Sequence, residues 1–157
     1  MRMPKLEKME NLRRRYQRIY AQLEPLLLKT ENKVARMATI AALLHNKMPY
    51  FFWTGFYLLE AGELVVGPYQ GSLACMVLKK KKGVCWAGIL RRMTIIVPDV
   101  HKFPGHIACD SRSNSEIVVP LFDEKNKAWS VLDVDSQNFN AFSEVDKEWL
   151  EKIVRLI

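Results

Sequence analysis

Three cysteines and three carboxylates are the residues of this chain whose types and spacing could do chemistry. Cys75, Cys85 and Cys109 lie in one stretch, each in a distinct setting rich in glycine or alanine. A thiolate is a nucleophile, and a second thiol can trap its oxidised sulfur as a disulfide. A lone cysteine is often an inert core residue. Three such thiols instead predict redox chemistry, with Cys109, downstream of His101 and His106, as the reactive one.

The carboxylates Glu116, Asp133 and Asp135 fall on two predicted strands, 115–122 and 128–135. Period-two geometry puts Asp133 and Asp135 on one face, which we expect to be shared with Trp129. A hairpin between the strands would bring Glu116 near them, whereas the plainer interpretation is a solvated sheet face. Clustered carboxylates repel, which raises the pKa of at least one and yields an acid beside an anion. An amino-acid ligand needs such a pair, since its ammonium attracts a carboxylate and a leaving oxygen needs a proton.

Two other chemistries are open. His101, His106 and Cys109 could hold a metal ion, but their spacing matches no common zinc pattern and the chain has no Cys-x-x-Cys pair. Trp53 and Tyr57, on a predicted strand at 50–59, could be ordinary core aromatics. A Trp face is also a good surface for a thioether or a sulfoxide methyl group.

Charge is unevenly distributed along the chain, whose net charge is +7. Residues 1–36 hold ten Lys and Arg against four Asp and Glu, and Lys79 to Lys82 form a further basic run. Residues 97–148, which contain the candidate chemistry, hold five against ten. Nucleic acids bind in basic grooves, so this asymmetry argues against a nucleic-acid site there. No apolar run reaches the length of a membrane span, and the first residues lack the apolar stretch of a signal peptide, so we expect no membrane partner and a cytoplasmic location.

The elements that position these residues follow from periodicity. An amphipathic helix is predicted at 5–28, with an arginine-rich face that is solvated or, less often, bound to a membrane surface. A second helix is predicted at 33–44, capped by Thr30. After strand 50–59 we expect a turn at Ala61-Gly62, a returning strand at 64–66, a loop or bulge at 67–71 and a third strand at 72–78 that holds Cys75.

Further along, a short helix at 83–93 holds Cys85 near its start, and a short strand at 94–97 leads into a loop at 98–113. The last helix starts at Ser143, with Asp146 in a capping-box position. The pattern predicts an α+β fold in which N-terminal helices and a C-terminal helix pack on a mostly antiparallel sheet. We expect one domain over 1–157, with helices in 1–46 and the sheet, active-site loops and closing helix in 50–157.

From about residue 6 to its end, the chain resembles the free methionine-(R)-sulfoxide reductases, enzymes built on a single GAF domain. The resemblance is carried by segments spread along the chain: Phe52-Trp53-Thr-Gly55-Phe56-Tyr57, Gly67-Pro68-Tyr69-Gln70-Gly71, Ala74-Cys75, Gly83-Val84-Cys85, Pro98-Asp99-Val100, Gly105-His106-Ile107-Ala108-Cys109-Asp110, Ser115-Glu116-Ile117-Val118-Val119-Pro120 and Leu132-Asp133-Val134-Asp135-Ser136. Three positions depart from the family's pattern: Trp86, the lysine run and Ser130.

The resemblance implies a GAF-like fold whose pocket holds free methionine sulfoxide. It implies that Cys109 is the catalytic cysteine, Cys75 the main resolving cysteine and Cys85 a second one. Its substrate-binding and proton-donating carboxylates would be Glu116, Asp133 and Asp135, and its aromatic wall Trp53 and Tyr57. It further implies no metal or other cofactor, thioredoxin as reductant and a homodimer. The alternative is a non-catalytic GAF module that senses a small molecule, which would have no need for three thiols.

Overall fold

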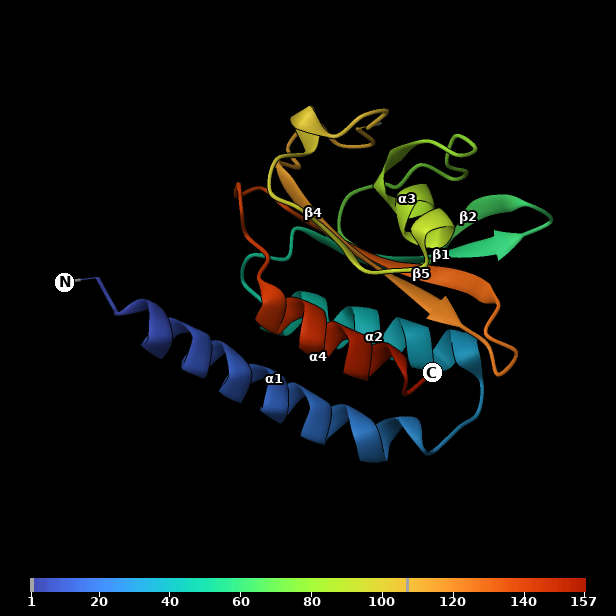
Figure 1. Ribbon diagram of the computed structural model, residues 1–157. Coiled ribbons are helices and arrows are strands. Elements are labelled where there is room, and N and C mark those ends of the chain that lie inside the picture. Colours follow the sequence, from blue (N-terminus) through green and yellow to red (C-terminus); the bar gives the residue numbers. More distant parts are fainter. Residues whose placement is uncertain (1, 107) are drawn as a thin grey trace.

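A five-stranded antiparallel sheet with helices on both faces forms the fold (Figure 1). The computed structural model describes residues 2–106 and 108–157, so Ile107 of the Gly105–Asp110 motif lies outside the described residues. The elements in chain order are α1 (Lys5–Leu27), α2 (Lys33–Lys47), β1 (Trp53–Glu60), β2 (Glu63–Gln70), α3 (Gly83–Arg91), β3 (Ile95–Val97), the 3-10 turn η1 (Val100–Lys102), β4 (Ser115–Phe122), β5 (Ala128–Ser136) and α4 (Glu144–Val154). The strand order is β2-β1-β5-β4-β3. The predicted α+β class with a GAF-like arrangement is confirmed.

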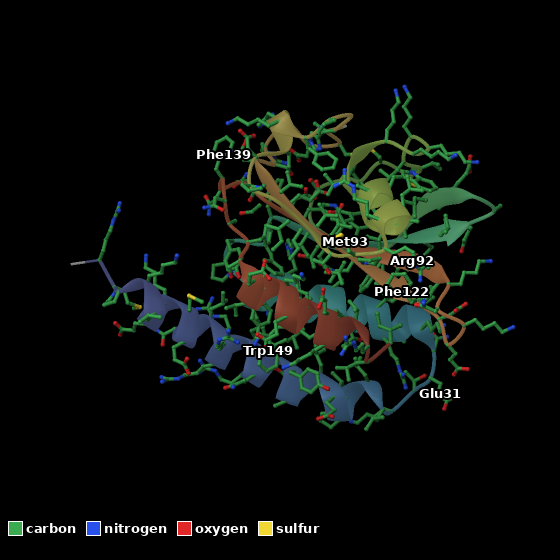
Figure 2. All side chains as sticks on the ribbon, viewed as in Figure 1. Glu31, Arg92, Met93, Phe122, Phe139 and Trp149 are labelled. Atoms are coloured by element: carbon green, nitrogen blue, oxygen red, sulfur yellow. A yellow bond between two sulfur atoms is a disulfide. The ribbon has the colours of Figure 1, made fainter. Side chains whose placement is uncertain are left out.

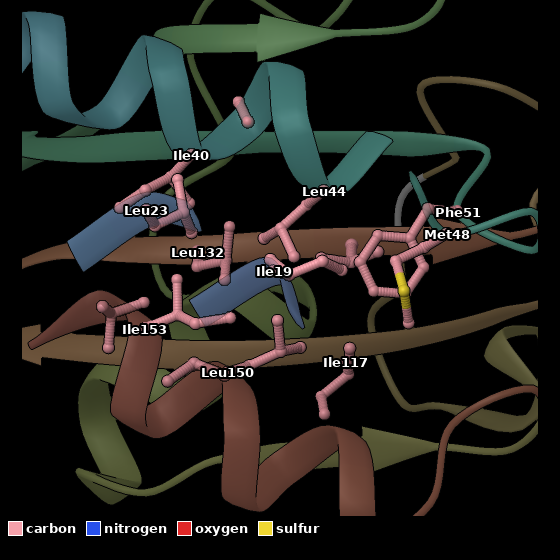
Figure 3. Packing of buried hydrophobic residues seen from close by; sticks show 14 of the residues in the cluster. Ile19, Leu23, Ile40, Leu44, Met48, Phe51, Ile117, Leu132, Leu150 and Ile153 are labelled. Carbon is pink, nitrogen blue, oxygen red and sulfur yellow. The ribbon is translucent and has the colours of Figure 1, made fainter. Parts of the chain in front are cut away.

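On one face of the sheet lie α2 and α4, with α1 packed against these two helices, and on the other lie α3 and the loops around it (Figure 1). Alternation along the strands divides the apolar side chains between these faces. Phe56, Ile117 and Leu132 join the three-helix side, where Figure 3 shows Leu132 and Ile117 packed among residues of α1, α2 and α4. The large core therefore lies on the face away from α3.

The smaller core lies between α3 and the opposite face of the sheet. Tyr57, Val118 and Val131 contribute to it from three strands, and Val84 and Ile89 from α3. The candidate carboxylates share this face.

Three local predictions are wrong, each for a physical reason. Asn32 rather than Thr30 caps α2, because its side-chain oxygen accepts from the Ala35 N–H at 2.9 Å. Residues 72–78 form no continuous strand and pair only at the isolated bridge Val65–Val77. The carbonyls of Ser72 and Cys75 instead accept hydrogen bonds from the side chains of Trp53 and Tyr57, which removes them from a strand ladder.

The third wrong prediction concerns Trp129, which does not share a face with Asp133. A β-bulge shifts the pairing between Leu121 and Phe122, and Trp129 packs against the three-helix core instead. Lys33 of α2 lies over its ring at 4.3 Å. β2 is also longer than predicted, and the expected bulge appears where its register with β1 shifts between Gly55 and Tyr57.

Asp146 is a buried carboxylate that ties the helices together. It accepts hydrogen bonds from the hydroxyls of Tyr16, at 2.7 Å, and Tyr50, and it completes the predicted capping box with Ser143. Trp149, one turn further along α4 and labelled in Figure 2, stacks on Tyr16 of α1. Their ring centroids are 6.2 Å apart. Within residues 2–106 and 108–157, none of the helices combines the length and the apolar character needed to cross a bilayer.

Replacing Asp146 by Ala should lower the free energy of unfolding by about 3 kcal/mol, because several buried donors lose their acceptor at once. Glu148→Ala is the matched control, since its ion pairs with Arg13 and Lys152 are exposed and such pairs contribute about 0.5 kcal/mol. Urea denaturation of both variants measures the difference. Equal losses would show that Asp146 does not have this role.

Candidate active site

A cavity of about 310 Å³ lies between the α3 side of the sheet and the surrounding loops. Its volume is at the lower end of the range of small-molecule pockets, which suits a ligand the size of an amino acid. All eight site residues predicted from the sequence line it: Trp53, Tyr57, Cys75, Cys85, Cys109, Glu116, Asp133 and Asp135. The fold therefore brings residues from six separate segments to one place: β1, the loop after β2, α3, the loop before β4, β4 and β5.

Strand pairing assembles the three carboxylates. In the register of β4 and β5, Glu116 lies opposite Asp135, and Val118 lies opposite Asp133. Because the strands are antiparallel neighbours, the three side chains share one face, as the predicted hairpin requires. Glu116 and Asp133 are at most 7 % exposed, so the face is buried rather than solvated.

The close approach of α3 adds Cys85 to this cluster. Gly88 makes the approach possible, since a Cβ at this position would lie only 2.9 Å from Val118 Cγ1. The Cys85 Sγ and one carboxylate oxygen each of Glu116 and Asp133 consequently lie within 4.8 Å of one another. Trp86, the neighbouring departure from the family pattern, is buried in the smaller core and is not among the residues that line the cavity.

Burial sets the protonation of this cluster. Burial, with repulsion from Asp133 and Asp135, raises the pKa of Glu116 well above its usual range. Burial also raises the pKa of Asp135. The pKa of Asp133 is raised by burial as well, but hydrogen bonding from Glu116 and Cys85 opposes the rise. Asp133 is thus the member best able to carry the negative charge, and Glu116 and Asp135 are the two able to keep a proton.

The Cys85 thiol is held in its neutral form. Burial, followed by the charges of Asp133 and Glu116, raises its pKa. A thiol of this kind is a poor nucleophile, because reactivity depends on the thiolate. Cys85 is buried in the structure, unlike the other two cysteines.

Trp53 and Tyr57 form an aromatic wall on β1. The Trp53 and Tyr57 rings stack with 5.8 Å between centroids, and Tyr69 of β2 also stacks on Trp53, at 5.2 Å. Gly55 makes this arrangement possible, because a Cβ there would lie 2.3 Å from Tyr69 Cβ and 2.7 Å from the Trp53 ring. The wall therefore presents a flat apolar surface next to the carboxylates.

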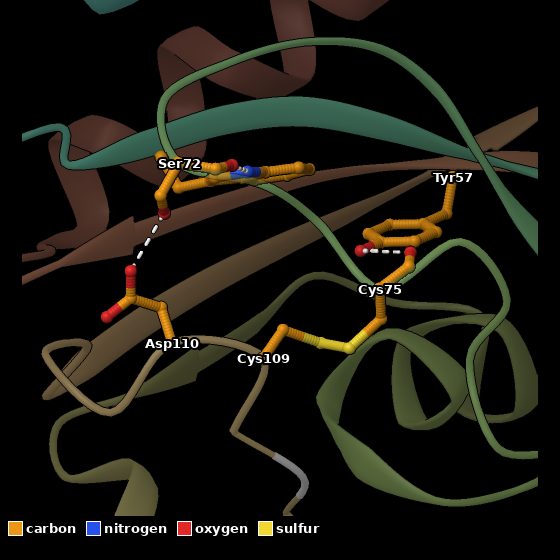
Figure 4. The surroundings of a disulfide bond; sticks show 6 residues. Tyr57, Ser72, Cys75, Cys109 and Asp110 are labelled. Atoms are coloured by element: carbon orange, nitrogen blue, oxygen red, sulfur yellow. Dashed lines mark hydrogen bonds between the residues drawn. A yellow bond between two sulfur atoms is a disulfide. The ribbon is translucent and has the colours of Figure 1, made fainter.

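Cys75 and Cys109 are joined in a disulfide at the edge of the cavity, with 5.7 Å between their Cα atoms (Figure 4). Cys109 is exposed and Cys75 is half-buried, so the bond faces the solvent as well as the cavity. On the Cys75 side, the Tyr57 hydroxyl donates to the Cys75 carbonyl at 3.3 Å. The pairing that the resemblance implies is thus formed in this structure.

A second polar link holds the two cysteine loops together. The Ser72 hydroxyl donates to Asp110 Oδ2 at 2.8 Å, beside the disulfide (Figure 4). Hydrogen bonds from Arg112, and then from Ser72, hold the pKa of Asp110 well below its usual range. Asp110 therefore remains an anion, and its charge is already partnered.

The alternative metal set is not assembled. Among the described residues, the group whose ligand atoms converge is Cys85, Glu116 and Asp133, rather than His101, His106 and Cys109. Cys109 is in the disulfide, and His101 Nε2 lies 2.9 Å from Asn114 Oδ1. The arrangement of thiols, carboxylates and aromatics suits thiol chemistry on a small zwitterion.

Several residues that line the cavity were not singled out as site residues from the sequence. Ser72 and Ser113 come from loops without periodicity, and the sequence holds no signal that would place them. Lys79 and Lys82 also line the cavity. The basic run to which they belong is the sequence signal that could have found them. Ser130, one of the three departures from the family's pattern, donates to the buried Tyr57 carbonyl at 2.9 Å and so secures the strand that bears the aromatic wall.

Comparison with known proteins finds relatives among GAF-domain proteins and free methionine-R-sulfoxide reductases. No family model matches the chain. It is 46% identical over 143 residues to "GAF domain-containing protein A" of Dictyostelium discoideum, covering 90% of this chain and 89% of the relative. It is 45% identical over 121 residues to the free methionine-R-sulfoxide reductase of Escherichia coli, covering 77% of this chain and 73% of the relative.

Solved structures agree with the sequence relatives. The free methionine-R-sulfoxide reductase of Neisseria meningitidis, solved in complex with its substrate, superposes with a TM-score of 0.85 at 38% identity, covering 90% of this chain and 84% of that one. With this fold, these thiols and these relatives, the chain belongs to the free methionine-R-sulfoxide reductase family of GAF-fold oxidoreductases.

Proposed function

We propose that this chain, as a single GAF-type domain, reduces free L-methionine-(R)-sulfoxide to methionine with its own thiols. The observation that carries the proposal is the Cys75–Cys109 disulfide at the edge of an amino-acid-sized cavity that contains three carboxylates and a Trp face. The disulfide is the state expected after one turnover. The named activity of the E. coli relative and the substrate complex of the Neisseria relative support the same reaction.

The reaction begins with the Cys109 thiolate, which attacks the sulfoxide sulfur while a carboxylic acid supplies a proton to the departing oxygen. The oxygen is transferred to Cys109 as a sulfenic acid, and the sulfoxide sulfur leaves as the thioether of methionine. Glu116 and Asp135 are the two candidate acids. The Trp53 face supports the methyl group, and the Asp133 carboxylate attracts the substrate ammonium.

The second half of the cycle restores the thiols. The Cys75 sulfur attacks the sulfenic acid of Cys109, which releases water and forms the disulfide. A dithiol protein, for which we propose thioredoxin, then reduces that disulfide by exchange, and the exposure of Cys109 gives it access. We propose Cys85 as a reserve resolving thiol, since its buried and protonated state makes it slow. A cytoplasmic location and a homodimer stay predictions from the sequence.

A GAF module that binds a small molecule without chemistry is the second candidate. The cavity itself would suit it, but the formed disulfide at the cavity edge favours the enzyme.

Purified protein should release methionine from the R diastereomer of free methionine sulfoxide, but not from the S diastereomer, with dithiothreitol as reductant. Cys109→Ser should abolish release, because the alcohol cannot take up the oxygen as a sulfenic acid. Chromatography of released methionine measures both. Absence of release from the wild type, with its thiols confirmed as reduced, would contradict the enzyme and leave the binding module.

Cys75 and Cys85 should differ as resolving residues. We expect Cys75→Ser to lower thioredoxin-dependent turnover by about a hundredfold or more, because only the slow Cys85 thiol then remains to resolve Cys109. Cys85→Ala should keep turnover within about twofold, since it leaves the Cys75–Cys109 pair intact. Steady-state assays with thioredoxin and its reductase test this. A larger loss from Cys85→Ala than from Cys75→Ser would reverse the assignment.

The rate at saturating substrate should fall as pH rises through the pKa of the proton donor. The sign follows from the raised pKa of Glu116, which keeps the carboxyl protonated at neutral pH and lets it ionise only in more alkaline solution. Single-turnover rates across pH for wild type, Glu116→Gln and Asp135→Asn measure the effect. The true donor is the residue whose variant lowers the rate about a hundredfold or more and loses the alkaline decline. Persistence of that decline in both variants would exclude both acids.

A further inference from the structure

The cavity is rich in acids, whereas the proposed substrate is a zwitterion. The Asp133 carboxylate can serve its ammonium group, but it repels its carboxylate, and the protonated Glu116 and Asp135 offer that carboxylate no positive charge. Asp110 also lines the cavity, with its charge partnered by Arg112. Among the described residues that line the cavity, Lys79 and Lys82 are the ones with cationic side chains that can attract an anion. His106 contributes no positive charge at neutral pH, because burial lowers its pKa.

The two lysines reach the cavity because the basic run folds as a tight turn. The Lys82 N–H donates to the Lys79 carbonyl at 3.2 Å, which closes a four-residue turn. Lys79 and Lys82 are therefore its two corners, held close together, while Lys80 and Lys81 form its tip. Leu78 anchors the start of the turn by donating to the Leu64 carbonyl at 2.9 Å, and α3 begins directly after its end.

The tip of the turn faces elsewhere. The ammonium nitrogen of Lys80 lies toward the β1–β2 turn, 3.5 Å from where a Cβ on Gly62 would stand. Lys81 takes the left-handed backbone conformation, with φ of 59°. Neither residue lines the cavity. Four adjacent residues of one type are thus divided into two with access to the cavity and two without.

We propose that Lys79 and Lys82 hold the α-carboxylate of the substrate and so favour free methionine sulfoxide over the peptide-bound form, an inference that rests on the proposed function. In peptide linkage this carboxylate becomes an amide and loses its charge. The lysines are positioning residues for binding, and the chemistry at the sulfoxide does not involve them. Their removal should therefore change KM and leave kcat nearly unchanged.

The test compares free methionine-(R)-sulfoxide with its primary amide, using dithiothreitol as reductant. Lys79→Gln and Lys82→Gln should each raise KM for the free acid by about fivefold, within the range of solvent-facing ion pairs. KM for the amide should not change, because the amide offers no carboxylate to lose. Lys80→Gln is the matched control, since it removes the same charge from the tip and should leave both values at the wild-type level.

Two results would overturn the assignment. An equal rise in KM from Lys80→Gln would show a general effect of charge, and unchanged KM in both corner variants would place the carboxylate elsewhere. Calorimetric binding of the acid and the amide, with the lysine changes made in Cys109→Ser protein, repeats the comparison without turnover. Failure of the proposed function, seen as no methionine release by the wild type, is thereby separated from failure of the lysine assignment.

Discussion

The grouping of two buried carboxyl groups and one half-buried carboxyl group beside a buried thiol, on one face of the sheet, is the constraint on which the rest of the structure depends. Ionised groups lose solvation when buried, so such a cluster persists only if protons or a cationic ligand reduce its charge. The raised pKa values of Glu116 and Asp135 show the first solution, and a substrate ammonium offers the second. The same cost that makes the cluster unfavourable for folding makes it useful for binding and for proton transfer.

The sheet accommodates this cost by assigning a different task to each of its faces. One face stabilises the fold, and the other holds the site. On one face, the residues packed under α1, α2 and α4 form the large apolar core. On the other, the smaller core around α3 shares its space with the cavity. Since neighbouring residues of a strand point to opposite faces, Leu132 and Asp133 serve different tasks although they are adjacent in sequence. Asp146 reinforces the supporting side, where its hydrogen bonds join the start of α4 to α1.

How far the sequence predicts this arrangement depends on the range of the interactions. Period-two alternation places Asp133 with Asp135, and a short hairpin adds Glu116, because both are local rules. Trp129 does not follow the alternation rule, because the β-bulge at this residue arises from the register between β5 and its neighbour β4. Residues 72–78 have strand character, but side chains from β1 take their carbonyls, which is a long-range effect. In the lysine run, the tight turn decides which residues are its corners and which form its tip. Four identical residues in sequence give no indication of that turn.

The Cys75–Cys109 bond also changes the mechanics of the chain. It closes a loop over a sequence separation of 34 residues, and it fixes the segment between β2 and α3, whose pairing with the sheet is limited to the Val65–Val77 bridge. In the chain-entropy description, a cross-link of this span stabilises the folded state by about 4 kcal/mol. A reaction cycle that makes and breaks the bond therefore alternates between a more and a less heat-resistant protein. The melting temperature becomes a direct readout of the redox state of the enzyme.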